Sequence, residues 1–339
     1  MIPQDKNTAI TRGLSEAFGV SECEDIREVT GGPGANPVFR IVVRRSAFLL
    51  RINLRAGDLV RHYACMKAAA EAGVAPRVWY TNVEDRISIT DFVNAAHFGP
   101  ADALARLPAA LRALHSLPQF PGVPDDRNST CMFLLHRGPA ADAFLQQFQA
   151  ANILPKEDFE ELVARYTQIA AAYSRHDPEL VSSHNDLFKP DNIVFDGQRV
   201  WLVDWEAAFR NDRYADLAVV ANMLVTNVAE ETAYLQVYFG QPPDAYQRAR
   251  LHLMRLAAHL FYAVVFLWQG ASSKPIDWSD PVPDYADFQR RFWAGEIKLT
   301  DAHTKTVYGR IHWTQFLHDV QQARYKEALA IVADRHAAG

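Results

Sequence analysis

Along the first ninety residues, short apolar runs of strand length are separated by turn residues, and one helical pattern interrupts them. The β-rich runs predict five strands, at residues 26–30, 38–43, 48–52, 77–80 and 87–92. Residues 7–18 are expected to form a first helix. A second helix begins near Asp58, has apolar residues at helical spacing and ends at Gly73. This pattern predicts a five-stranded antiparallel sheet accompanied by two helices.

After Val93 the apolar positions take the spacing of long helices. Helices are expected at residues 101–115, 140–149 and 156–174, and again from Ala215 onward. Between them, two short apolar runs flank Asp196-Gly197, a two-residue hairpin signal. The length is sufficient for two packed lobes. We therefore expect an α+β, bilobal fold, with a small sheet lobe at residues 1–93, a larger helical lobe at 94–339 and a hinge at 90–94.

Composition restricts the classes of protein to which the chain can belong. The net charge is −5 and no run of Lys and Arg stands out, which argues against a nucleic-acid binder. The three cysteines are scattered without zinc-ligand spacing, as suits a reducing compartment. The N-terminus has no apolar signal segment, and the most apolar run, 256–268, is too short to span a bilayer. We expect a cytoplasmic protein that binds neither nucleic acid nor a membrane.

The segment His184-Asn185-Asp186 carries the strongest chemical signal in the chain. The apolar run before it is short, which places Asp186 on a loop. An aspartate on a loop often only caps neighbouring backbone groups. A loop aspartate can also accept the proton of a hydroxyl group that attacks a phosphoryl group. The polar residues downstream favour this second interpretation.

Asn192, Asp204 and Glu206 supply oxygen ligands at the ends of the expected hairpin. Asn192 stands at the entrance of one strand, and the return strand delivers Asp204 beside it. Glu206 points the same way as Asp204 in an extended segment, although a solvent-facing ion pair explains it equally well. Carboxylate and amide oxygens suit Mg²⁺. The sequence thus brings a base, Asp186, and a metal-holding pair to one point, as phosphoryl transfer from ATP-Mg to a hydroxyl requires.

Taken in order, these motifs resemble those of the choline/ethanolamine kinase branch of the aminoglycoside phosphotransferase superfamily, which has a bilobal, protein-kinase-like fold. The resemblance covers roughly residues 25–300 and is strongest at 180–220. The residues that carry it are His184-Asn185-Asp186, Asn192, Asp204-Trp205-Glu206, the run from Asn211 to Ala218, and upstream Gly31-Gly32, Asn36, Phe48 to Arg51 and Leu111 to His115. The resemblance implies an ATP- and Mg-dependent kinase that phosphorylates the hydroxyl of a small amino alcohol.

The same resemblance implies roles for residues of the sheet lobe. A glycine loop containing Gly32 and Gly34 would cover the nucleotide phosphates with backbone N–H groups. Asn36 would fix the shape of that loop. Arg51 stands where protein kinases have a lysine, and its guanidinium fork would bind the phosphates of ATP.

Further roles follow at the hinge and around the catalytic loop. Backbone groups of four hinge residues would meet the adenine: Thr90, Asp91, Phe92 and Val93. His184 and Asp216 are assigned structural roles. Asp216 would cap and brace the catalytic loop, and His184 would hydrogen-bond the backbone near Asp204.

Two positions depart from the family pattern. The helix residue that normally pairs with the strand cation is a Glu, but the corresponding count falls on His62. Arg51 would then pair with Asp58, one turn earlier, or with phosphate alone. Asn192 follows Asp186 by six positions where five is usual, so that Asp191 stands at the usual count. We favour Asn192 as the metal ligand because strand register fixes its direction, and Asp191 is the alternative.

The acceptor site is expected in the helical lobe, where aromatic residues are dense between positions 256 and 293. Ring faces would hold an ammonium group by cation–π attraction, and acidic residues would receive an amine. The candidates are Tyr262, Phe266, Trp268, Asp284, Tyr285 and Phe288. The paired Trp residues typical of choline cages align with Tyr262 and Val265 here. Aminoglycoside phosphorylation is therefore the second interpretation, and a catalytically weak nucleotide-binding module, suggested by His62, is the third.

Overall fold

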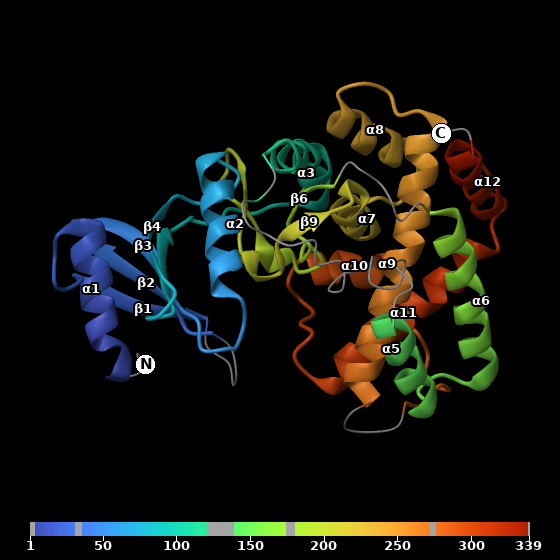
Figure 1. Ribbon diagram of the computed structural model, residues 1–339, viewed down its shortest axis with the longest axis horizontal. Helices are drawn as coiled ribbons and strands as arrows, with labels where there is room; N and C mark the ends of the chain where they lie inside the picture. Colours follow the sequence, from blue (N-terminus) through green and yellow to red (C-terminus); the bar gives the residue numbers. More distant parts are fainter. Residues whose placement is uncertain are drawn as a thin grey trace.

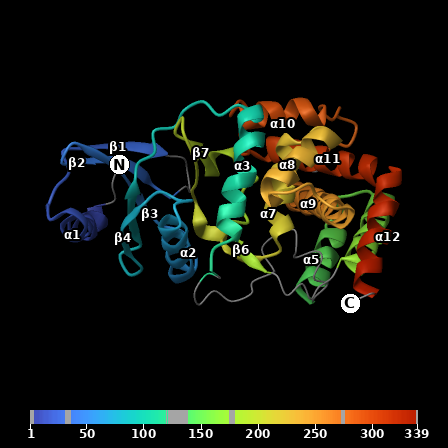
Figure 2. The ribbon, with the colours of Figure 1, turned by 90° about the horizontal axis from the view of Figure 1, so that it is seen from above.

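The computed structural model describes residues 4–30, 36–118, 120, 139–173, 180–271 and 276–337. A five-stranded sheet lies at one end of the molecule and a set of helices at the other, with α2 (Leu59–Glu71) between them (Figure 1). Helix α1 (Asn7–Phe18) lies beside the sheet, at the end remote from the helical lobe, in Figure 1 and Figure 2. The expected two-lobed α+β arrangement is confirmed.

The sheet is antiparallel, with the strand order β1-β2-β3-β5-β4. Its strands are β1 (Asp25–Thr30), β2 (Val38–Val43), β3 (Ser46–Ile52), β4 (Val78–Asn82) and β5 (Ile87–Asp91). Ile41 and Leu50 are fully buried on the face that α1 covers. Burial alternates along β2 and β3 because successive side chains of a strand point to opposite faces. All five predicted strands are present, and their ends differ from the predicted ones by at most two residues.

Helix α2 connects the sheet to the helical lobe. Asp58 caps its first turn by accepting a 3.0 Å hydrogen bond from the backbone N–H of Arg61. Its buried side chains, among them Tyr63 and Met66, belong to the core of the helical lobe rather than to the small core of the sheet. The helix also contacts the short 3₁₀ helix η3 (Trp205–Ala207), which follows Asp204 directly. Helix α2 therefore bridges the sheet, through β4, and the segment that follows Asp204.

The helical lobe is built around α9 (Ala245–Ala271), which α7, α11 and α12 cover. Its other helices are α3 (Pro100–His115), α5 (Pro139–Ala150), α6 (Lys156–Ala172), α7 (Arg213–Leu224), α8 (Val228–Phe239), α10 (Tyr285–Trp293), α11 (Ala302–Val320) and α12 (Ala323–Ala337). The apolar run at 256–268 is thus part of a helix of 27 residues. In the described part of the chain α9 alone is long and apolar enough to cross a membrane, and 78% of its apolar window is buried inside the protein.

Helices α9 and α11 approach each other closely at Gly309. A Cβ atom at this position would lie 2.8 Å from the backbone N of Leu267 and 3.1 Å from the carbonyl O of Ala263. We expect Gly309→Ala to lower the free energy of unfolding by about 1–3 kcal/mol, because backbone atoms cannot move aside as a flexible side chain can. Denaturant unfolding followed by circular dichroism measures the change. Gly57→Ala is the control, since a Cβ there meets nothing within 4 Å; equal stabilities of the two variants would contradict the prediction.

Two short antiparallel strand pairs position the loops between the lobes. Strand β6 (Val181–Ser183) pairs with β9 (Phe209–Asn211), and β7 (Ile193–Phe195) pairs with β8 (Val200–Leu202). Beyond the second pair, the backbone N–H of Val203 donates to the carbonyl of Asn192 over 3.0 Å. The segments that carry Asp186 and Asp204 are consequently adjacent.

The turn of the β7–β8 hairpin differs from the predicted two-residue Asp196-Gly197 turn. The backbone N–H of Asp196 donates to the carbonyl of Arg199 over 3.2 Å, so these two residues close the turn and Gly197 lies inside it. The Asp196 carboxylate accepts 2.8 Å hydrogen bonds from the N–H groups of Gln198 and Arg199. The prediction placed Asp196 at the tip because the dipeptide signal ignores this side-chain capping.

Candidate active site

A hollow of about 520 Å³ lies between the sheet and the helical lobe, within the size range of small-molecule sites. Nine of the predicted cofactor and metal residues line it: Asn36, Arg51, Thr90, Asp91, Phe92, Val93, Asn192, Asp204 and Glu206. Gly32 and Gly34 lie outside the described residues. The alternative ligand Asp191 also lines the hollow. The structure thus gathers residues from both lobes around one cavity.

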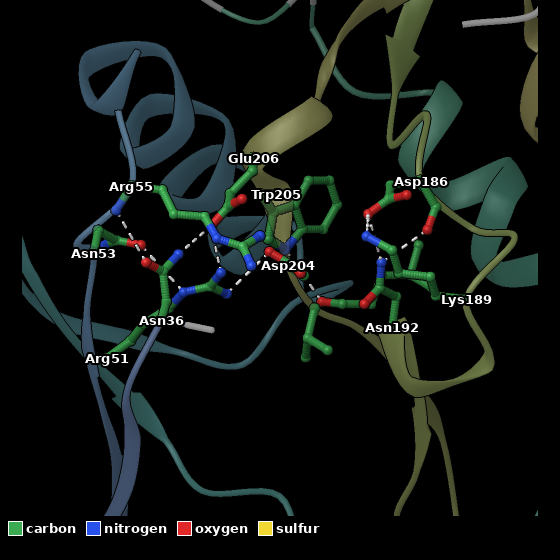
Figure 3. A network of polar contacts seen from close by, with 12 residues as sticks. Asn36, Arg51, Asn53, Arg55, Asp186, Lys189, Asn192, Asp204, Trp205 and Glu206 are labelled. Carbon is green, nitrogen blue, oxygen red and sulfur yellow. Dashed lines mark hydrogen bonds and ion pairs between the residues drawn. The ribbon is translucent and has the colours of Figure 1, made fainter. Parts of the chain in front are cut away.

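Asp186 lies on the loop after β6 and is held from two sides (Figure 3). Its Oδ2 atom accepts a 3.1 Å hydrogen bond from the side-chain amide of Asn192, which also donates to the Asp186 carbonyl over 2.8 Å. The ammonium group of Lys189 lies 2.7 Å from the same Oδ2 atom. Lys189 lines the hollow as well. Sequence reasoning missed this residue, although a lysine three positions after the proposed base was a visible signal.

Arg51 joins the sheet to the residues after β8 (Figure 3). Its Nη1 atom lies 2.9 Å from Asp204 Oδ1, and its Nη2 atom pairs with Glu206 Oε1. Its Nε atom donates to Asn53 Oδ1 over 3.2 Å. The side-chain amide of Asn36 donates to Glu206 Oε1 over 2.9 Å. The carboxylate partner of Arg51 is therefore supplied by Asp204 and Glu206, and the expectation of Asp58 or phosphate alone as its partner was wrong.

The surroundings shift the pKa values of Asp186 and Asp204 in opposite directions. Burial raises the pKa of Asp186 above its usual value, and the Lys189 ammonium only partly opposes this. Burial acts in the same direction on Asp204, but the charges of Arg51 and Lys189 outweigh it and hold the pKa of Asp204 below its usual value. Opposite shifts of two neighbouring carboxylates are typical of sites in which one group exchanges a proton and the other remains charged.

A buried brace fixes the loop that carries Asp186. The carboxylate of Asp216, which is 1% exposed, accepts 2.8 Å hydrogen bonds from the backbone N–H groups of His184 and Asn185. The ring of His115 lies 3.1 Å from the same carboxylate, and the ring of His184 lies 2.8 Å from the carbonyl O of Val203. Asp216 and His184 thus occupy the bracing positions that we expected for them.

Both loops of the site contain a strained backbone residue. Asn185 has a φ of 66° and Asp204 a φ of 69°, in the left-handed region. Such a conformation costs on the order of 1–3 kcal/mol and persists only where the surroundings impose it. Three carbonyl groups and Asn211 surround the Asn185 side chain. The strain therefore falls on residues next to or at the expected catalytic and metal-holding positions.

The residues of the hollow fit a hard divalent cation. Asn192 offers an amide oxygen, and Asp204 and Glu206 offer carboxylate oxygens on the same cavity, which is the donor chemistry of Mg²⁺. Within the described ranges, no group of three or more His, Cys, Asp or Glu side chains is placed to hold a metal by protein ligands alone. A cation here would therefore complete its shell with water and phosphate oxygens, as Mg²⁺ does at nucleotide sites.

The structure does not bring the six predicted acceptor residues together. Tyr262 and Phe266 lie near the catalytic loop, with ring centroids 5.0 and 5.7 Å from that of Phe188. Trp268 packs instead on α5 against Phe144 and Phe148. Phe288 is buried in the helical core beside Tyr308. Tyr262 and Phe266 are themselves buried in this core, at 6% and 5% exposed, so the aromatic density in the sequence mainly reflects core packing.

The two remaining acceptor candidates lie at the start of α10. Asp284 caps this helix by accepting a 2.8 Å hydrogen bond from the N–H of Asp287. Tyr285 donates to the carbonyl of Asn222 over 2.7 Å. Both line a second hollow, of about 850 Å³, which shares no lining residue with the first. Their assignment to one acceptor pocket with Tyr262 and Phe266 is corrected accordingly.

The bilobal fold and the polar cluster between its lobes define a kinase-like phosphotransferase architecture. Residues 25–252 match the phosphotransferase enzyme family known as APH, and the chain belongs to that family. It is a member of a family of small-molecule kinases. No curated protein sequence matches the chain.

Solved structures of the same fold include kinases with different acceptors. A choline/ethanolamine kinase family protein from Mesorhizobium loti has 20% sequence identity and a TM-score of 0.67, and the match covers 97% of this chain and 99% of that one. Choline kinase from Cryptosporidium parvum has 12% identity and a TM-score of 0.63, with 96% and 99% covered. The streptomycin-ATP-APH(2")-IIa complex has 14% identity and a TM-score of 0.55, with 80% and 92% covered. At these identities the likeness establishes the fold.

Proposed function

We propose that the protein is an ATP- and Mg-dependent kinase that transfers the γ-phosphoryl group of ATP to the hydroxyl of a small amino alcohol, as a choline or ethanolamine kinase does. The observation that carries the proposal is the position of Asp186. It lies on a braced loop, bonded to Asn192 and Lys189, which both line the hollow that contains Arg51 and Asp204. A base beside a phosphate-binding cavity is the arrangement that phosphoryl transfer to a hydroxyl needs.

The side chains of the site have separable tasks in this reaction. Lys189 and Asn192 hold one carboxylate oxygen of Asp186, so its other oxygen is available to accept the proton of the acceptor hydroxyl. Arg51 would bind phosphate oxygens with its guanidinium fork. Most of the rate acceleration would come from positioning and charge neutralisation rather than from a covalent intermediate.

Mg²⁺ would be held by Asn192, Asp204 and Glu206, and when bound it neutralises charge on the transferred phosphoryl group. Asn192 is the preferred ligand over Asp191 for a structural reason. Asn192 is 4% exposed and fixed by its bonds to Asp186, whereas Asp191 is exposed. A ligand that is already fixed loses less side-chain freedom when the cation binds.

The choice of an amino alcohol is supported by the rings around the catalytic loop. Phe188, two residues after Asp186, contacts Tyr262 and Phe266 and carries the Lys189 ammonium 5.4 Å from its ring centroid. Phe188 is half-buried, and a ring face beside the base suits a substrate that carries an ammonium group next to its hydroxyl. Tyr262 and Phe266 support this ring from behind and are themselves buried. The likeness in fold to choline and ethanolamine kinases points in the same direction. A cytoplasmic location completes the proposal, and the free thiols of Cys23 and Cys65 support it.

The proposed function is tested by a titration followed by an acceptor screen. We expect ATP-Mg to stabilise the protein against thermal unfolding, by about 2.7 kcal/mol at a concentration 100 times the dissociation constant. Mass spectrometry should then detect a phosphorylated product with choline, ethanolamine or another amino alcohol. Stabilisation by nucleotide without any product would indicate the nucleotide-binding module. Product formed only with aminoglycosides would indicate an antibiotic kinase.

A further inference from the structure

The guanidinium group of Arg51 occupies the position at which the proposed site would hold its cation. It pairs with Asp204 and with Glu206, two of the three side chains expected to bind Mg²⁺ (Figure 3). The two carboxylates carry two negative charges, and the positive charge of Arg51 neutralises one of them. A divalent cation that approaches these oxygens therefore meets both a competitor for the same atoms and half of the attractive charge.

Helix α2 offers Arg51 no alternative carboxylate. His62, on this helix, is 3% exposed, lines the same hollow as Arg51 and is near enough to feel its charge. Asp58 is engaged at the start of the helix, and Glu71, the one acidic residue within α2, stands at its other end. The imidazole is neutral or positively charged, so it cannot replace a carboxylate. Burial and the neighbouring Arg51 lower the pKa of His62 to about 4 and keep the ring neutral near pH 7.

The Nδ1 atom of His62 is buried and has no hydrogen-bond partner among the described residues. A buried ring nitrogen without a partner costs free energy unless a bound group satisfies it. This residue therefore offers Arg51 no negative charge, and its Nδ1 atom makes no hydrogen bond to the described residues. Because His62 supplies no carboxylate, the guanidinium of Arg51 pairs with Asp204 and Glu206 instead.

We propose that His62 is a positioning residue that leaves Arg51 on Asp204 and Glu206 in the nucleotide-free protein, so that a divalent cation binds well only after nucleotide phosphates draw Arg51 away. This inference rests on the proposed function, since it assigns the phosphates of ATP as the second partner of Arg51. It makes metal binding conditional on nucleotide binding. In a chain with an acidic residue at position 62, Arg51 would pair with that residue, and Asp204 and Glu206 could bind the cation before nucleotide binds.

The inference is tested by titrating the nucleotide-free protein with Mn²⁺, which takes the same oxygen ligands as Mg²⁺, and following free Mn²⁺ by electron paramagnetic resonance. His62→Glu gives Arg51 a carboxylate on α2. We expect its Mn²⁺ dissociation constant to be at least ~10-fold lower than that of the wild type, within the usual range of coupling between two sites. Arg51→Met removes the guanidinium and is expected to lower the constant similarly, which keeps the test decisive if His62→Glu folds poorly.

Two control variants separate the proposed effect from a general effect of charge. Val60→Glu adds the same charge to the same helix, but residue 60 is 67% exposed and its variant is expected to bind Mn²⁺ as the wild type does. His62→Gln stays neutral and is also expected to match the wild type. A folded His62→Glu variant with the Mn²⁺ constant of the wild type would overturn the role of His62. An unchanged constant for Arg51→Met would overturn the competition between Arg51 and the cation. Since no ATP is present, tighter Mn²⁺ binding by an inactive chain would support the inference and contradict the proposed function.

Discussion

Asp186→Asn is expected to lower the rate of phosphoryl transfer by about 10²–10⁴-fold, the usual contribution of a general base. The amide has the shape of the carboxylate and keeps an oxygen for Lys189 and Asn192, but it cannot accept a proton. Asp186 does not line the nucleotide hollow, so the affinity for ATP-Mg should be retained. Turnover with the best acceptor from the screen measures the first effect, and thermal-shift titration with ATP-Mg measures the second.

Asp102→Asn provides a matched control, because it makes the same chemical change at an exposed position in the first turn of α3. Its turnover should equal that of the wild type. An Asp186→Asn variant that is folded, binds ATP-Mg and turns over at the wild-type rate would refute the assignment of Asp186 as the base. If the variant lost both ATP binding and turnover, Asp186 would instead be assigned to the support of the nucleotide site.

The sheet and the catalytic loops were predictable because local patterns determine them. Strand β2 begins and ends at the predicted residues, since alternating burial leaves one register for a strand with one buried face. The positions of Asn192 and Asp204 followed from the same logic, because two paired strands bring the residues at their open ends together. The pairs β2–β3 and β7–β8 join strands that follow each other in the chain, so their contacts are between residues close in sequence.

The partner of Arg51 was not predictable in this way. The guanidinium reaches Asp204, 153 positions away in sequence, and Glu206, 155 positions away. The sequence showed that the usual Glu of the helix was replaced by His62. It contained no periodic signal for which carboxylate would pair with Arg51 instead. Packing between distant parts of the chain, including that of α2 on η3, places the two carboxylates beside the strand.

The acceptor candidates were also not predictable from the sequence pattern. Tyr262 and Phe288 have the same aromatic character in the sequence, and both pack beside Tyr308 in the core, yet Tyr262 also contacts the catalytic loop through Phe188. A helix pattern specifies which residues share a face, but not whether that face meets the core or a site. The approach of helices from distant parts of the chain decides this.

Asp216→Ala is expected to lower the free energy of unfolding by about 3–5 kcal/mol, the cost of removing one member of a buried, charge-assisted network. The variant would leave three donors without their acceptor: the backbone N–H groups of His184 and Asn185 and the ring of His115. Denaturant unfolding at pH 7 measures this change. Asp280→Ala, at an exposed position, is the control and should stay within about 0.5 kcal/mol of the wild type.

The stability that Asp216 contributes is expected to depend on pH. Burial opposes ionisation of Asp216, but its hydrogen bonds and the nearby histidines outweigh burial and hold its pKa below the usual value. The carboxylate therefore binds its proton more readily in the unfolded chain, where the pKa is about 3.9. The stability that it contributes is complete above that pH and is lost as the pH falls through the lower pKa of the folded state. The difference in unfolding free energy between wild type and Asp216→Ala should accordingly shrink as the pH falls below about 4. A difference that grows below that pH would show that Asp216 is protonated in the folded protein and braces the loop as a neutral group.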